Sequence, residues 1–383
     1  MAAANSVLIV GSGIVGQSLA VGMARRGIRC EIVEIKENFD IAGAGILIQG
    51  TGMRAFDEIG VGDDVRGVGW SERTRVTFRD VGENIVAAVE AGDDRGPLPG
   101  GVSFERQALH EKLAELVAAD GIPVRMGTTV ETIDNGDDAV GVTFTDGTSG
   151  AFDLVVGCDG IRSRVRATVF GVEEPEYAGF VAWRYILPRP PGLSEMMWYW
   201  GRITTIGVVP IAEDLIYLAG TSAEPDRPRF DRERLPDIYR ERFAEFGHLI
   251  PHLLSRVTEP DKVVATPMEQ VILPPPWHRG RVVVMGDAAH ATCPFWAQGA
   301  SMGLEDAALF VRFLTESDDL ADMCGRWFER RYPRCMMVQK GSYETGKMSH
   351  RHEGEGPKIF PPPVREMIQK QMNERLQALA APY

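Results

Sequence analysis

The chain begins with a short apolar strand, a glycine-rich turn, a helix and a second strand, and this order constrains its fold more than any other feature. Residues 11–16 read Gly-Ser-Gly-Ile-Val-Gly, the G-x-G-x-x-G pattern of a dinucleotide-binding β–α–β unit. The first glycine permits the turn, the second lets backbone approach a pyrophosphate, and the third lets helix and strand pack closely. Glu34 ends the second strand, where a carboxylate accepts hydrogen bonds from ribose hydroxyls. The expected dinucleotide contacts are Gly11, Gly13, Ile14, Val15, Gly16, Glu34, Ile35 and Lys36.

Residues 281–308 are predicted to form a buried strand, an acidic turn, a loop of small residues and a helix. Asp287 follows the strand, where its carboxylate can hold sugar hydroxyls. Gly299 opens the helix, whose free amides and dipole stabilise negative charge. This pairing suits a cofactor with a polyol chain and a ring that becomes anionic, although a purely structural unit has the same pattern. The expected cofactor contacts are Asp287, Pro294, Gly299, Ala300 and Ser301.

Two further segments carry cationic side chains that suit phosphate groups. Arg106 stands in the first turn of a predicted helix, where the dipole disfavours a positive charge. A phosphate contact outside the helix is one interpretation, and a plain surface arginine is the other. Asp159 begins a turn after a buried strand and is followed by Arg162, Arg164 and Arg166, which either contact phosphate or are solvated at a helix start. The expected cofactor contacts in these segments are Arg106 and Asp159. Val130, which lies between the two segments, is a further expected contact.

Composition excludes several classes of function. The net charge of −13 and the lack of a basic cluster argue against nucleic acid as a partner. Five widely spaced cysteines without a Cys-x-x-Cys pair favour neither a disulfide framework nor a metal site, and a reducing cytoplasm is expected. No apolar run reaches the roughly 18 residues of a membrane span, so no membrane partner is expected.

The chain is predicted to divide into two lobes. Residues 1–175 form the first part of the dinucleotide-binding domain, with a β-hairpin excursion near 73–100. Residues 176–273 are rich in strand-like and aromatic runs, which predicts a mostly antiparallel sheet with one face over a pocket. Residues 274–335 return to the first lobe, and residues 336–383 form a helical tail.

The C-terminal part is predicted to be helical. Residues 304–314 and 321–332 have helical periodicity, and Pro333 is expected to end or kink the second of these helices. A proline-rich linker and a charged amphipathic helix occupy residues 361–383. That helix either caps the domain or contacts a second subunit, so a homodimer is one possibility.

Together these motifs resemble the class A FAD-dependent aromatic hydroxylases, the p-hydroxybenzoate hydroxylase group, over residues 7–335. The fingerprint with Glu34 resembles that family's site for the ADP half of FAD. Residues 158–166 resemble its Asp-Gly motif, which serves FAD and NAD(P)H, and residues 286–299 resemble its second FAD motif. Arg106 matches its arginine at the FAD phosphates. The resemblance implies an α/β fold with a Rossmann-like FAD-binding domain of the glutathione reductase type, an inserted mostly antiparallel β-sheet substrate domain and C-terminal helices.

The resemblance also implies an activity. FAD would be bound tightly and non-covalently, NAD(P)H would reduce it as co-substrate, and O₂ would form a flavin C4a-hydroperoxide that hydroxylates a small aromatic substrate. A single Gly-rich fingerprint indicates that no separate domain binds NAD(P)H. Epoxidation, Baeyer–Villiger oxidation and halogenation on the same scaffold are alternatives, and so is a non-catalytic dinucleotide-binding protein.

Within the family, residues 43–46 and 286–300 are most similar to 2-methyl-3-hydroxypyridine-5-carboxylate oxygenase, 6-hydroxynicotinate 3-monooxygenase and salicylate hydroxylase. Tyr217 matches a substrate-binding tyrosine of the first of these enzymes. Thr205 stands where that enzyme has an arginine for the substrate, and Leu47 stands where relatives carry His or Tyr. The resemblance therefore implies a substrate that is larger, less acidic or differently anchored. The expected catalytic residues are Tyr217 and Pro294, and the expected substrate contacts are Leu47, Thr205, Tyr217, Phe295 and Trp296.

Overall fold

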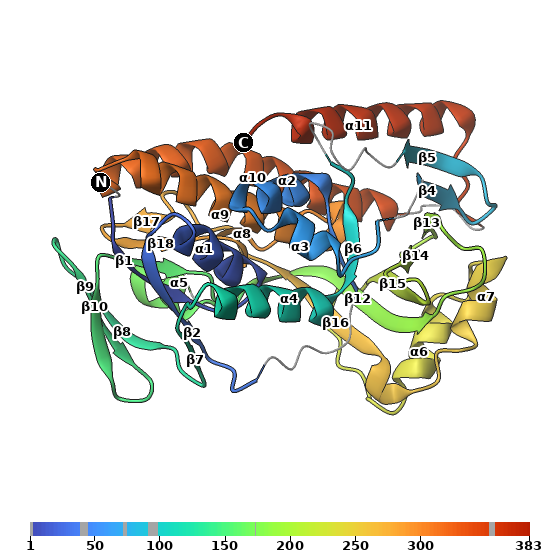
Figure 1. Cartoon of the computed structure of the whole chain (residues 1–383). Coiled ribbons are helices and arrows are strands. Elements are labelled where there is room, and N and C mark those ends of the chain that lie inside the picture. The colour runs from blue at the N-terminus through green and yellow to red at the C-terminus, as the bar shows by residue number, and fades with distance from the viewer. Residues whose placement is uncertain (1–2, 39–44, 72–74, 91–98, 173, 352–356) are drawn as a thin grey trace.

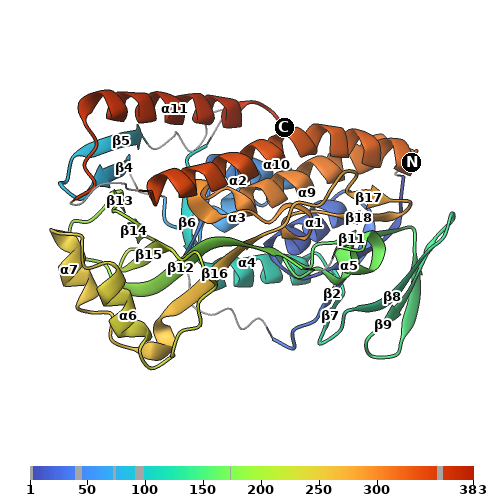
Figure 2. The same ribbon diagram turned by 180° about the vertical axis from the view of Figure 1, so that it is seen from behind.

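A computed structural model describes residues 3–38, 45–71, 75–90, 99–172, 174–351 and 357–383. Two sheet-based lobes lie side by side, and the long C-terminal helices run along one side of both (Figures 1 and 2). Part of the small-residue run at 43–46 lies outside the described residues. Among the described residues, no helix combines the length and the apolar character needed to cross a membrane.

The first lobe is built on a six-stranded sheet with the order β17-β18-β11-β1-β2-β7. All neighbouring strands are parallel except β17 and β18. The central strands are continuous apolar runs because helices cover both faces of a parallel sheet. The strands are β1 (Ser6–Val10), β2 (Arg29–Glu34), β7 (Val124–Met126), β11 (Leu154–Gly157), β17 (His278–Arg279) and β18 (Val282–Val284). The helices of this lobe are α1 (Ile14–Ala24), α2 (Gly50–Ile59), α3 (Gly62–Arg66), α4 (Arg106–Ala119), α5 (Arg164–Phe170), α8 (Asp287–His290) and α9 (Gly299–Glu316).

Two small sheets complete the first lobe. A two-stranded sheet pairs β3 with β6 and carries residue Leu47. A three-stranded antiparallel sheet projects from one end of the lobe (Figure 1). These strands are β3 (Gly45–Ile48), β6 (Val102–Glu105), β8 (Val130–Asn135), β9 (Val140–Phe144) and β10 (Ser149–Phe152).

The second lobe is a seven-stranded sheet with the order β16-β12-β15-β14-β13-β4-β5. The hairpin β4–β5 belongs to this sheet, because β4 pairs in parallel with β13. The remaining pairs are antiparallel. The strands are β4 (Arg75–Asp80), β5 (Ile85–Glu90), β12 (Glu176–Pro188), β13 (Met196–Trp200), β14 (Thr204–Pro210), β15 (Leu215–Ala223) and β16 (Val264–Gln270).

The two faces of this second sheet have different roles. One face packs on α6 (Leu235–Arg242) and α7 (Leu249–Leu254) around the buried side chains of Trp183, Tyr239 and Phe243. The short η1 turn (Pro260–Lys262) leads from these helices into β16. The opposite face is turned toward the first lobe and lines a cavity.

The last part of the chain is two long helices, α10 (Leu320–Ser349) and α11 (Pro362–Ala380). Pro333 lies inside α10, which continues to Ser349, so the expectation that Pro333 ends this helix is wrong. Proline removes one backbone hydrogen bond, and the ion pairs of Arg331 and Arg334 hold the helix on either side of it. In both views α11 lies over β5 (Figures 1 and 2), and Gln369 bonds to the Ala88 backbone there.

Candidate active site

The glycine-rich turn between β1 and α1 has the geometry that its spacing predicts. Gly11 has a φ of 103°, and a Cβ on it would lie 2.5 Å from the Cys158 carbonyl oxygen. A Cβ on Gly16 would lie 2.0 Å from the Gly11 carbonyl oxygen. Gly13 has open space on its Cα, so a ligand can approach the backbone there. Gly13, Ile14 and Val15 line the cavity at the N-terminus of α1, where amides favour a phosphate.

The end of β2 carries the predicted carboxylate. Oxygens of Glu34 accept hydrogen bonds from the Ser12 amide at 2.8 Å and the Lys36 amide at 3.0 Å. Ile35 beside it is 61% exposed, which leaves an apolar surface suited to a flat ring. Val130 is buried at the start of β8 and does not line the cavity, so its cofactor contact stays a prediction.

The turn after β18 faces the same cavity from the opposite side. Asp287, Gly299 and Ala300 line it, and the η2 turn (Pro294–Trp296) lies between them. Asp287 is open to the cavity but enclosed by protein, so burial raises the pKa of its carboxyl. Ser301 lies deeper, and its hydroxyl accepts a hydrogen bond from the Gln49 amide at 3.1 Å.

Arg106 and Asp159 lie between these two turns. Arg106 lines the cavity, and burial lowers the pKa of its guanidinium. Asp159 Oδ2 caps α5 by accepting from the Arg164 amide at 2.7 Å, whereas its Oδ1 is buried without a hydrogen-bond partner among the described residues. An unpaired buried carboxylate oxygen is a suitable acceptor for a cofactor hydroxyl.

Two of the three arginines after Asp159 have partners within the protein. Arg166 is buried and donates to the carbonyl oxygens of Ile161, Val172 and Ala288, so its role is structural. Arg162 pairs with Glu269 at 2.9 Å. The other interpretation, solvated arginines at a helix start, fits Arg162, whose side chain is 57% exposed, but not the buried Arg166.

The cavity extends from the cofactor turns to the face of the second sheet and has a volume of about 680 Å³. All five predicted substrate contacts line it. Burial raises the pKa of Tyr217, and the nearby Arg184 opposes this. Further lining residues from the sheet are mostly apolar or aromatic: Val76, Phe78, Ala182, Met196, Trp198, Trp200, Val209 and Ala219.

The C-terminal helices also line the cavity, which sequence reasoning missed. Arg375 on α11 stacks over the Trp296 ring at 4.8 Å, and burial lowers its pKa to about 10. Within the described part of the chain it has no ion pair or hydrogen bond. The amphipathic pattern of α11 indicated a packed helix, but nothing in the pattern indicates which element it covers. The other lining residues from α10 and α11 are Thr345, Met348, Ser349, Ile368, Gln371 and Met372.

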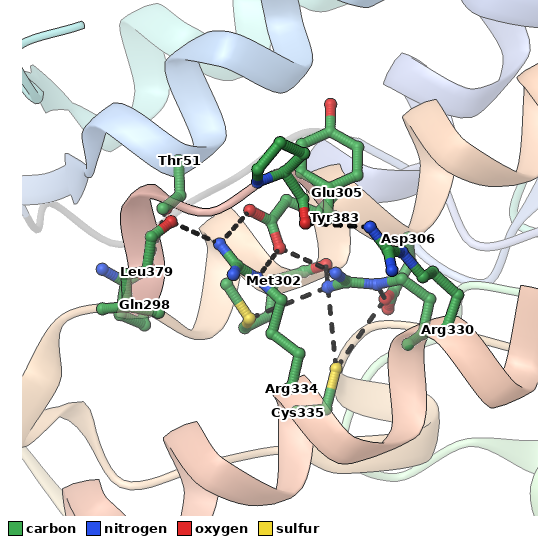
Figure 3. A network of polar contacts seen from close by, with 12 residues as sticks. Thr51, Gln298, Met302, Glu305, Asp306, Arg330, Arg334, Cys335, Leu379 and Tyr383 are labelled. Carbon is green, nitrogen blue, oxygen red and sulfur yellow. Dashed lines mark hydrogen bonds and ion pairs between the residues drawn. The ribbon is translucent and has the colours of Figure 1, made fainter. Parts of the chain in front are cut away.

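A buried network of charges connects α9 with α10 (Figure 3), and through Asp306 it reaches the turn after β18. Asp306 accepts hydrogen bonds from the Gly286 amide at 3.0 Å and from Arg331 at 2.7 Å, and it pairs with His290 at 2.6 Å. Burial alone would lower the pKa of His290, but the neighbouring Cys335 and Asp306 raise it well above its usual value. His290, Asp306 and Cys335 could hold a metal by their spacing, but Arg331 already supplies positive charge to this carboxylate.

Residues 4–317 match the sequence model of the FAD binding domain family. The chain belongs to this family. Aurachin C monooxygenase/isomerase of Stigmatella aurantiaca is 31% identical, over 96% of this chain and 94% of its own. 6-Hydroxynicotinate 3-monooxygenase of Bordetella bronchiseptica is 27% identical, over 88% and 91%. The structure of Klebsiella pneumoniae HpxO with FAD and uric acid has a TM-score of 0.83 at 21% identity, covering 98% and 95%.

These similarities confirm the predicted family, the α/β fold and FAD as the cofactor of an oxidoreductase. This FAD-binding protein has side chains that fit the group. Gly13 leaves backbone open to the cavity, Asp159 offers a carboxylate oxygen that has no partner among the described residues, and Asp287 lines the cavity with a second carboxylate.

Proposed function

We propose that this protein is an aromatic monooxygenase that uses NAD(P)H and O₂ to insert one oxygen atom into an aromatic or heteroaromatic small molecule. One observation carries the proposal: a single cavity connects the dinucleotide turn of α1 to an aromatic face of the second sheet. A protein that only bound a dinucleotide would not need this second, apolar compartment. FAD, when bound, supplies the hydride acceptance and the oxygen activation that such chemistry requires.

The side chains around the cofactor end would hold and polarise it. Asp287 is the acceptor for the ribityl hydroxyls, because it is the acid at the turn that lines the cavity. The amides at Gly299 and Ala300 begin the 18-residue helix α9, whose positive end stabilises negative charge on the reduced ring. Pro294 would fix the turn beside the ring. Arg106 and the α1 amides would contact the phosphates.

The substrate end would orient an aromatic ring and exclude water. Tyr217 stays protonated near pH 7 because burial raises its pKa, so its hydroxyl can donate a hydrogen bond to the substrate. Leu47, Phe295 and Trp296 form an apolar wall next to the cofactor turn. Excluding water from such a site limits side reactions of reactive intermediates. With one dinucleotide fingerprint, NAD(P)H would bind transiently rather than in a domain of its own.

The test is NAD(P)H consumption by the FAD-loaded protein with a panel of phenols, hydroxypyridines and quinolones. The expected result is substrate-dependent consumption and a product heavier by one oxygen atom. Peroxide formation in place of product with every panel member would contradict the proposal. An epoxide or a ring-expanded product would instead support one of the alternative oxygen insertions on this scaffold.

A further inference from the structure

A short chain of hydrogen bonds runs from the cavity wall to the end of α10. Thr205 and Thr221 lie directly opposite one another on β14 and β15, and their hydroxyl oxygens are 2.5 Å apart. The Thr221 oxygen lies 2.8 Å from Nε2 of His350, the residue that follows α10. Both threonines line the cavity, and His350 is buried.

The other ring nitrogen of His350 determines the direction of these bonds. Nδ1 lies 2.8 Å from the carbonyl oxygen of Gly346, which can only accept a hydrogen bond. Nδ1 therefore carries the proton, since two lone pairs at this distance would repel each other. The Ser349 hydroxyl oxygen also lies 3.0 Å from Nδ1, but its hydrogen is donated to the same carbonyl oxygen at 3.1 Å, so toward Nδ1 it can only accept.

His350 is neutral near pH 7. Burial lowers its pKa to about 4. The backbone of Gly346 and of Thr221 acts in the opposite direction, and the positive charge of Lys358 acts in the same direction as burial. The rings of Phe180 and Phe295 lie 5.0 and 5.3 Å from the imidazole. A neutral ring with its proton on Nδ1 leaves Nε2 as a fixed acceptor. Because the ring resists protonation, it positions its neighbours and does not serve as a base.

The proton position on His350 also determines which group donates in the hydrogen bonds that lead back to the cavity. Nε2 of His350 accepts the single hydrogen of Thr221, and the Thr221 oxygen then accepts the hydrogen of Thr205. Thr205 has no other hydrogen, so its hydroxyl offers only lone pairs to a molecule in the cavity. A hydroxyl that normally rotates to suit either partner is thereby restricted to accepting.

We propose that Thr205 selects ligands that present an N–H or O–H group to it, and that Thr221 and His350 set this preference through the hydrogen bonds that lead from Thr205 to the imidazole. The inference rests on the proposed function, which places an aromatic substrate in this part of the cavity. A ligand with an acceptor or a methyl group at that point would leave the lone pairs of Thr205 unpaired. Burying an unpaired polar group weakens binding by roughly 10- to 100-fold.

The test compares matched pairs of ligands that differ in one donor. FAD-loaded protein is titrated with 4(1H)-quinolone and 1-methyl-4-quinolone, and with 2-naphthol and 2-methoxynaphthalene, and binding is read from the flavin absorption spectrum. The donor form of a pair is expected to bind about 10- to 100-fold more tightly. Thr205→Val should abolish the preference, and Thr205→Ser should retain it.

Thr221→Val is the decisive variant because it keeps Thr205 but frees its hydrogen. The preference should then fall to about threefold or less, or reverse, since the Thr205 hydroxyl can donate again. A purely structural role for Thr221 would change the affinity for both members of a pair equally. A preference that survives Thr221→Val contradicts the proposal, and so do equal affinities within both pairs or no spectral change with any of the four ligands.

A second measurement does not depend on variants that fold. Nitrogen-15 NMR of histidine-labelled, FAD-loaded protein should show His350 with its proton on Nδ1, and a proton on Nε2 would overturn the proposal. Ligand binding is read without NAD(P)H or turnover. Protein that binds with the expected preference but forms no oxygenated product would therefore count against the proposed function and not against this assignment.

Discussion

Arg331 and Arg375 are both enclosed by protein, but only Arg331 has carboxylate partners. Arg331 donates to Glu305 and to Asp306, each at 2.7 Å, and all three side chains are fully buried. Arg375 stacks on Trp296 in the cavity wall with no carboxylate partner among the described residues. Enclosing a charge that lacks a carboxylate partner costs free energy, so the half-buried Arg375 should contribute less to stability than Arg331.

We expect opposite effects from removing these two charges. Arg331→Met should lower the free energy of unfolding by about 3–5 kcal/mol, because Glu305 and Asp306 would stay buried with fewer partners. Arg375→Met should leave the free energy of unfolding unchanged or raise it. Urea unfolding of both variants beside the unchanged protein measures this, and a large loss of stability in Arg375→Met would contradict the description of this residue.

Asp287 gives a second prediction for a single residue. Asp287→Ala should weaken FAD binding by roughly 10- to 100-fold, since it removes hydrogen bonds to a charged group worth about 1.5–3 kcal/mol. Flavin fluorescence during titration of the apoprotein measures the affinity. Asp63→Ala is the control, because the Asp63 side chain is 99% exposed on α3. Equal FAD affinity in the two variants would show that Asp287 does not contact the cofactor.

The helices differ in how far their roles follow from the sequence. The turn into α1 was predictable because backbone geometry requires glycine at Gly11 and Gly16, so a local pattern carries the whole signal. The start of α9 was predicted from the small residues after Gln298, although a Cβ on Gly299 would meet only the Thr292 methyl group at 3.4 Å. The roles of α10 and α11 depend on which part of the molecule the end of the 30-residue helix α10 reaches. The local spacing of residues does not indicate this position. Arg375 and His350 could therefore not be predicted.

The end of α10 also leads to a prediction for pH. Burial lowers the pKa of His350 to about 4, so between pH 6.5 and 4 the unfolded state binds a proton that the folded state does not. Above about pH 6.5 this group therefore costs no stability, and the free energy of unfolding falls as the pH drops from 6.5 toward 4. His290 acts in the opposite direction near pH 6.5, because its raised pKa keeps it protonated in the folded state while the unfolded state still takes up a proton, and its contribution becomes constant as the pH falls further.

His350→Gln should therefore flatten the fall in unfolding free energy between pH 7 and pH 5. Urea unfolding at several pH values measures this slope for the variant and for the unchanged protein. The buried His110, whose pKa burial also lowers to about 4, contributes a second part of the slope and serves as a comparison through His110→Gln. An identical slope in His350→Gln and the unchanged protein would show that His350 is not a neutral buried group.

The cavity of the whole molecule lies between two lobes, and residues of the C-terminal helices form part of its lining. These helices run along both lobes (Figure 2). The tail is held by polar contacts and not only by apolar packing. Arg334 donates to the Leu379 carbonyl oxygen at 2.6 Å and pairs with Glu305 on α9, as Figure 3 shows. The Tyr383 hydroxyl donates to Glu58 at 2.7 Å. The α9 helix thus connects the cofactor turn to the wall that α11 supplies.

Deleting residues 361–383 should open the substrate end while leaving the parallel sheet in place. The expected result is retained FAD, with several-fold more of the consumed NAD(P)H appearing as hydrogen peroxide, because water can then enter the site. Peroxide yield per NAD(P)H measures this coupling. Tyr383→Phe is the control, because it removes one contact and keeps the wall. Unchanged coupling in the deletion variant would show that α11 does not enclose the substrate.

Oxygen incorporation tests the central claim most directly. The FAD-loaded protein is supplied with NAD(P)H, a substrate from the aromatic panel and ¹⁸O₂ in ordinary water, and the product is analysed by mass spectrometry. The account predicts one ¹⁸O atom per product molecule. A product whose new oxygen comes from water, or turnover that yields no oxygenated product, would contradict it.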